Sequence, residues 1–170
     1  MQFEPYDDFP GVHIFELDSL LQDLHDTQGT EGLADFARHL LQEIHASKVD
    51  LAHYAKPVEE VSRWLADRPV TQSPQSEECL RSRKSLQNGG ASAACIGLGK
   101  CHSPLAAVHF VALHLLRGLD VDQLVQASKH YCTFFYFLSL KPDLQHLGRD
   151  ADVAEARLKL WLLKKLGRTY

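Results

Sequence analysis

The sequence has no apolar run of about 18 residues, the length that a helix needs to cross a membrane. Its longest apolar stretch, Leu105–Leu116, is shorter and contains His109 and His114. Residues typical of strands are sparse, while Leu, Ala, Gln, His and Asp are frequent. Residues Met1–Pro10 are acidic and aromatic instead of basic and then apolar. We therefore expect no secretory signal, no membrane partner and a cytoplasmic location.

Acidic residues are absent from one long segment. No Asp or Glu occurs in residues 79–119, which carry a charge of +5. Residues 1–78 carry −11 and residues 120–170 carry +2, so the net charge of −4 hides a strong asymmetry along the chain. Such a separation predicts pairing of the acidic and basic parts within the chain, self-association, or a basic face for an anionic partner.

The length of 170 residues is enough for one well-buried core and short for two domains. We therefore expect a single domain over residues 1–170. The expected fold class is all-α, a compact bundle of about six to seven helices around a central apolar helix. Residues 69–76 are polar and contain proline, which predicts a mobile loop there.

Helical periodicity places the individual elements. The pattern predicts helices over residues 18–25 and 31–46, separated by a turn at 27–30. It predicts further helices over residues 104–118, 120–138 and 151–166, and shorter ones near 57–68 and 76–86. The segment 132–138 (CTFFYFL) is also compatible with a strand.

Four residues have the chemistry of metal ligands. Thiolates and imidazoles suit zinc or an iron–sulfur cluster. The competing interpretation is that the cysteines are buried structural thiols. His130 lies two residues before the last cysteine, and side chains at that helical spacing point about 200° apart, so both can hardly bind one ion. The candidate ligands are Cys95, Cys101, His102 and Cys132.

Other cofactor and enzyme classes leave weaker signals. Ala94–Cys101 resembles a phosphate-binding loop, but it has Ala94 where the motif needs glycine and Cys101 where it needs a hydroxyl. No Glu-x-x-His pair for a di-iron centre is present. Haem bound through His109 and a nucleophilic Cys101 beside His102 stay open as alternatives. No cofactor is expected, and whether the chain is an enzyme is left uncertain, with a non-enzyme favoured.

Two groups of basic residues are candidates for binding a partner or an anion. A basic stripe that contains an aromatic can bind phosphates and stack on a base or on a protein. The competing interpretation is a solvated face whose positive charge suits a helix C-terminus. The first group is Arg81, Arg83 and Lys84, and the second is Arg157, Trp161, Lys164 and Arg168.

Together these observations favour a small regulatory or adaptor protein that binds another protein through helix surfaces, and possible self-association is part of this hypothesis. The first alternative is a nucleic-acid-associated transcriptional regulator that uses the basic C-terminal part. The second alternative is a metal- or haem-binding protein that uses the cysteines and histidines.

Overall fold

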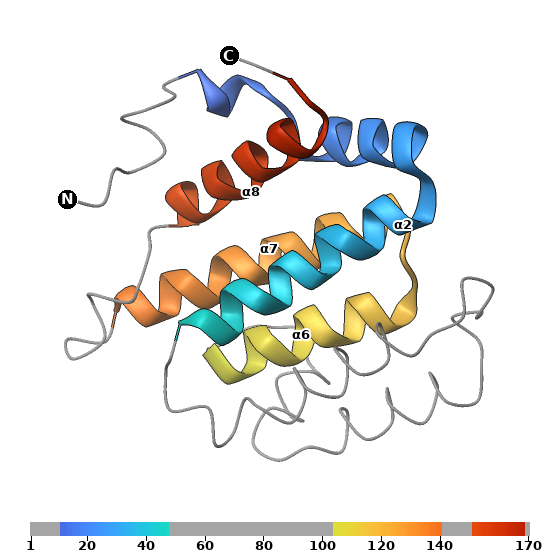
Figure 1. Cartoon of the computed structure of the whole chain (residues 1–170). Coiled ribbons are helices and arrows are strands. Elements are labelled where there is room, and N and C mark those ends of the chain that lie inside the picture. The colour runs from blue at the N-terminus through green and yellow to red at the C-terminus, as the bar shows by residue number, and fades with distance from the viewer. Residues whose placement is uncertain (1–10, 48–103, 141–150, 169–170) are drawn as a thin grey trace.

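A computed structural model of the chain describes residues 11–47, 104–140 and 151–168 (Figure 1). Within these ranges the chain forms one 3-10 turn and four α-helices, and no strand. The predicted all-helical class is confirmed for this part of the chain. The predicted helices near 57–68 and 76–86 and the loop at 69–76 lie outside the described residues. The elements are η1 (Val12–Ile14), α2 (Leu17–Ala46), α6 (Pro104–Arg117), α7 (Val121–Ser139) and α8 (Ala151–Lys165).

Helix α2 is a single kinked element where the sequence pattern predicts two helices and a four-residue turn. Only Gly29 leaves the helical conformation, with φ 66° and ψ −157°. Glycine adopts such backbone angles readily because it has no Cβ, whereas other residues are strained there. The predicted turn over residues 27–30 is therefore wrong in extent, because the chain changes direction at one residue.

The buried residues of α2 repeat at helical spacing on both sides of the kink. Leu20, Leu21 and Leu24 are buried before Gly29. After the kink, seven apolar residues are at most 3% exposed, and most of them lie three or four positions apart. They are Leu33, Ala34, Phe36, Ala37, Leu40, Leu41 and Ile44.

Helices α6 and α7 form an antiparallel pair joined by a short turn. Asp120 caps α7, because its Oδ1 accepts a hydrogen bond of 2.9 Å from the backbone N–H of Gln123. The side chain of Gln123 bonds to Nδ1 of His114 on α6 at 2.8 Å, so it ties the two helices together. The CTFFYFL segment is helical, and it buries Phe134 and Phe135 in the core.

Helix α7 contacts α2, α6 and α8, the three other described helices. Helix α8 lies beside α7 and runs antiparallel to the second half of α2, residues 30–46 (Figure 1). Among the described residues, none of the helices has the length and apolarity needed to span a bilayer.

Helix α8 ends in a Schellman motif. Gly167 has φ 69°, and its N–H bonds to the carbonyl of Lys164 at 3.0 Å. The N–H of Arg168 bonds to the carbonyl of Leu163 at 2.9 Å. These two bonds satisfy carbonyls that the end of a helix would otherwise leave unpaired. They also direct the chain after α8 back toward the first half of α2.

Candidate functional site

The second half of α2 and helix α8 meet along a polar contact that we call the α2–α8 seam. Because the helices are antiparallel, a step of four residues forward on α8 matches a step of four residues back on α2. Residues four apart lie on one face of a helix, so this spacing gives about one contact per turn. The contacts are Arg157 with Glu43, Trp161 with His39, and Lys165 with Asp35.

Glu43 lies at the first of these contacts and is largely buried. Its Oε1 accepts a hydrogen bond of 3.1 Å from Nη2 of Arg157, and it lies 3.8 Å from Nε2 of His39. The side chain of Glu43 is 13% exposed and that of Arg157 is 37% exposed. The carboxylate is therefore held between one permanent cation and one imidazole.

His39 is neutral at neutral pH in this setting. Burial lowers its pKa below the ordinary 6.5, and Arg157 lowers it further, whereas the carboxylate of Glu43 raises it. Its Nε2 is buried and finds no hydrogen-bond partner among the described residues, and the same is true of Nε of Arg157. Because this imidazole atom is shielded from solvent, a dissolved substrate could not reach it in this conformation.

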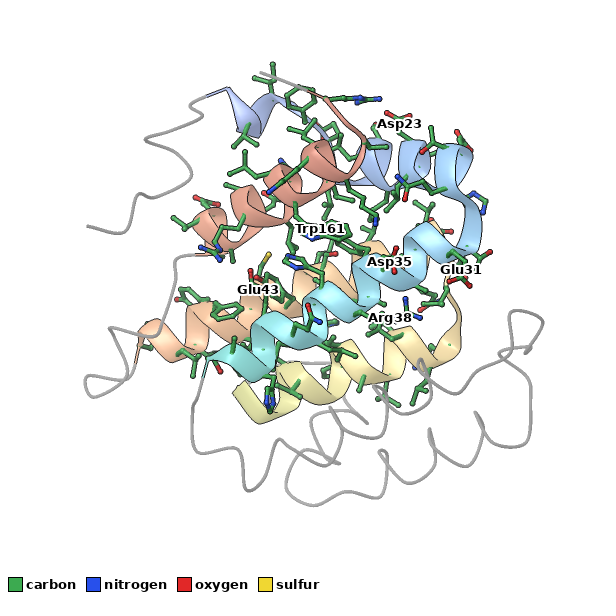
Figure 2. All side chains as sticks on the ribbon, viewed as in Figure 1. Asp23, Glu31, Asp35, Arg38, Glu43 and Trp161 are labelled. Atoms are coloured by element: carbon green, nitrogen blue, oxygen red, sulfur yellow. The ribbon has the colours of Figure 1, made fainter. Side chains whose placement is uncertain are left out.

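Trp161 fills the middle of the seam. Its ring stacks on His39, with centroids 4.8 Å apart and planes 13° apart, and lies 5.7 Å from the ring of Phe36. Nζ of Lys165 lies 6.0 Å from the Trp161 ring, at the outer limit of a cation–π contact. Figure 2 shows Trp161 reaching from α8 toward α2, between Asp35 and Glu43. It is the main aromatic anchor of α8.

The kink in α2 allows α8 to contact the first half of α2 as well. Nη2 of Arg168 lies 2.6 Å from Oδ2 of Asp23. The side-chain amide of Gln28 donates a hydrogen bond of 3.1 Å to the carbonyl of Lys165, at the end of α8. These contacts follow from Gly29, because a straight α2 would carry Asp23 and Gln28 away from this corner.

The residues of the predicted C-terminal basic group lie in different environments in the structure. Arg157 and Arg168 pair with carboxylates of α2, and Trp161 stacks inside the seam. Lys164 is exposed. Of the arrangements that the charge asymmetry predicts, pairing within the chain is therefore present. The other predicted basic group, Arg81, Arg83 and Lys84, lies outside the described residues.

Of the predicted metal ligands, the structure describes one. Cys132 lies on α7, and burial raises the pKa of its thiol to about 12, helped by Glu155 and Asp152 of α8. His130 instead stacks against α6, so the two residues do point to different neighbours. Within the described part of the chain, no group of three or more histidine, cysteine and acidic side chains could hold a metal ion. Cys95, Cys101 and His102 lie outside the described residues.

Three rings stack between α6 and α7. The ring of His130 lies between Phe110, at a centroid distance of 4.7 Å, and His114, at 5.3 Å, with planes within 16° of parallel. Burial and the neighbouring His114 and Lys129 lower the pKa of His130 to about 4. Burial also lowers the pKa of His114, although its hydrogen bond to Gln123 raises it. Both histidines are therefore neutral at neutral pH, and their rings stack on each other.

No known protein family, curated protein sequence or solved structure matches this chain. Its function must therefore be argued from its own contacts, of which the α2–α8 seam is the most developed.

Sequence reasoning missed the α2 side of this seam. On a helical wheel of residues 31–46, Asp35 and His39 fall opposite the apolar residues, which by itself indicates a face exposed to solvent. A signal was present, because Asp35, His39 and Glu43 follow one another at four-residue spacing, as do Arg157, Trp161 and Lys165. Reversing the direction of one set matches opposite charges at both ends, which predicts an antiparallel pair.

Proposed function

We propose that this protein is a small, soluble, cytoplasmic regulatory or adaptor protein that binds another protein through helix surfaces. The observation that carries the proposal is the α2–α8 seam. It is a helix-on-helix contact that combines register, charge complementarity and an aromatic anchor, which are the features by which helices recognise one another. We further propose that the whole chain is one domain of six to seven helices, and that self-association is possible.

The same observation argues against the nucleic-acid alternative for the C-terminal residues. A phosphate contact requires a cation that is free to replace the counterions of the nucleic acid. Arg157, Lys165 and Arg168 are already paired with carboxylates of α2. The overall charge of −4 also repels a polyanion.

The first experiment separates these two functions. We expect purified protein to bind duplex and single-stranded DNA negligibly near about 150 mM salt in an anisotropy titration. An affinity tighter than about 1 µM that falls steeply with salt would overturn the proposal in favour of the regulator of nucleic acid.

The second experiment maps the surfaces in cells with a photo-crosslinking amino acid. Suitable positions are Gln42 on α2, Gln126 on α7 and Lys164 on α8, because all three are exposed. Binding through one helix surface predicts a discrete crosslinked protein from some of these positions and none from the others. Absence of any crosslinked protein from all three, with no oligomer in light scattering, would count against the proposal.

A further inference from the structure

The interface of α8 differs in chemistry from the rest of the core. Helix α6 buries only apolar residues in its described part, whereas α8 buries Lys159, which is 6% exposed, together with three leucines and two alanines. The α2–α8 seam also contains two buried nitrogen atoms, Nε of Arg157 and Nε2 of His39, that lack hydrogen-bond partners among the described residues. A buried polar atom without a partner favours the separated state, in which water can reach it.

Two of the three ion pairs that hold α8 and its C-terminal end are open to water and to salt. Lys165 and Asp35 have side chains that are 34% and 38% exposed, and Arg168 and Asp23 are 45% and 42% exposed. Pairs with this exposure contribute little to stability and weaken further as salt is added. They can nevertheless select which helix binds, because a helix with the wrong charges meets repulsion at the same positions.

The surface that remains on α2 when α8 is set aside has a definite chemistry. We call it the acidic face, and define it by Asp23, Asp35, His39 and Glu43. Glu43 and Asp35 each face a cation of α8, Asp23 faces Arg168 just after the end of α8, and the imidazole faces an indole. The bound α8 therefore displays the ligand that the acidic face accepts, which is an amphipathic helix with cations and one aromatic at four-residue spacing.

We propose that α8 is the resident occupant of this acidic face, and that a basic amphipathic helix of a partner protein takes its place when α8 opens. This inference rests on the proposed function, for which it names the class of partner. The partner helix must also carry apolar residues where α8 has Leu158, Leu162 and Leu163, since these fill the core. The device is autoinhibitory, because α8 must leave before the partner can bind.

Cys132 reports the opening of α8. Its thiol is partly buried in the closed structure, and Asp152 and Glu155 of α8 act on it electrostatically. When α8 leaves, the thiol gains solvent and loses these two carboxylates, so it reacts more readily with an alkylating agent. Alkylation measured on the Cys132 peptide by mass spectrometry separates this thiol from the other three cysteines of the chain.

The binding test uses a fluorescent peptide of residues 151–168 added to the full-length chain. The double variant Arg157→Gln/Lys165→Gln leaves the acidic face intact but removes two of the ion pairs between α8 and α2. The form of the protein in which α8 has separated from α2 is therefore more populated in this variant. Apparent affinity scales with the open fraction, and we expect the peptide to bind this variant about 3–10-fold more tightly than the wild type. A peptide that carries Arg157→Glu and Lys165→Glu is the matched control and should lose this binding.

The opening test uses the same two proteins. Alkylation of Cys132 should be faster in the variant by a similar factor, and the wild-type peptide should slow it again. If the variant does not fold, the wild type serves alone, because raising the salt from about 50 to about 500 mM should accelerate alkylation of Cys132. Alkylation that is indifferent to salt, or a peptide that fails to bind at about 100 µM, would overturn the inference. Crosslinks that persist at Gln42 or Gln126 in that case would leave the proposed function standing.

Discussion

Substitution of Gly29 by alanine tests whether the kink in α2 is required by the fold. The residue has φ 66° and ψ −157°, and a Cβ built there would meet no other atom within 4 Å. The cost of Gly29→Ala therefore comes from the backbone alone. A residue other than glycine held in such a region is strained by about 1–3 kcal/mol.

Part of this strain is offset in the unfolded state. Alanine has fewer unfolded conformations than glycine, which favours folding by about 0.4–1 kcal/mol. We therefore expect Gly29→Ala to lower the free energy of unfolding by about 1–2 kcal/mol in urea titrations followed by circular dichroism. The matched control is Gly11→Ala, because Gly11 has φ −85° and equally open space around it. There only the unfolded-state effect acts, so the control should be unchanged or slightly more stable.

The opposite signs expected for the two substitutions make the test sharp. If Gly29→Ala proves as stable as the wild type, the kink is not a fixed feature and the reasoning about α2 fails. A rise in helical signal, with loss of the Arg168–Asp23 pair, would show that α2 has straightened at this position. In that outcome the corner where α2 meets the end of α8 would also be lost.

Further predictions concern the core, pH and the seam. Leu113→Ala and Leu33→Ala should each cost about 2–5 kcal/mol in the same titration, since Leu113 is 1% and Leu33 0% exposed, and a smaller loss at either would show that its cavity collapses. His130 has a pKa of about 4 in the folded protein and an ordinary pKa near 6.5 in the unfolded chain. Between these pH values only the unfolded chain binds the proton, so the free energy of unfolding is highest above pH 6.5 and falls as the pH drops toward 4. The loss should be about 1–2 kcal/mol after allowance for solvent screening, and His130→Gln should flatten this slope; an equal slope would refute the assignment. A double-mutant cycle of Arg157→Gln and Glu43→Gln should give a coupling of about 0.5–1 kcal/mol, and no coupling would show that their contact is not maintained in solution.

The helices could be predicted because their apolar residues repeat at helical spacing. The patterns over residues 31–46 and 151–166 both end within one residue of the observed helices. The helix predicted from residue 120 does begin there, because the side chain of Asp120 accepts a hydrogen bond from the N–H of Gln123 and caps α7. The turn before residue 31 was misjudged, because a Gly flanked by polar residues indicates a break but not how many residues the break takes.

The α2–α8 seam was harder to predict because it depends on which helices meet. Periodicity identifies the buried face of a helix against the main core, and Asp35 and His39 lie away from that face. A second helix can cover such positions when it brings matching groups, as Trp161 does over His39. The sequence of α2 alone does not distinguish a polar face that α8 covers from one that faces solvent.

The four-residue pattern of the seam explains how weak contacts can fix the position of α8. If α8 slid by one turn along α2, Arg157 would face neutral His39 or pass beyond Glu43, and Trp161 would be placed against a carboxylate. The first shift loses the contacts of Arg157 and Trp161 and leaves Lys165 opposite Glu31, whereas the second shift loses all three contacts. The buried leucines of an amphipathic helix tolerate a one-turn shift far better. The apolar residues therefore supply most of the stabilisation, and the charged and aromatic residues select one register among several of similar burial. The same selectivity would admit a partner helix only if its cations and aromatic residue follow the spacing of Arg157, Trp161 and Lys165.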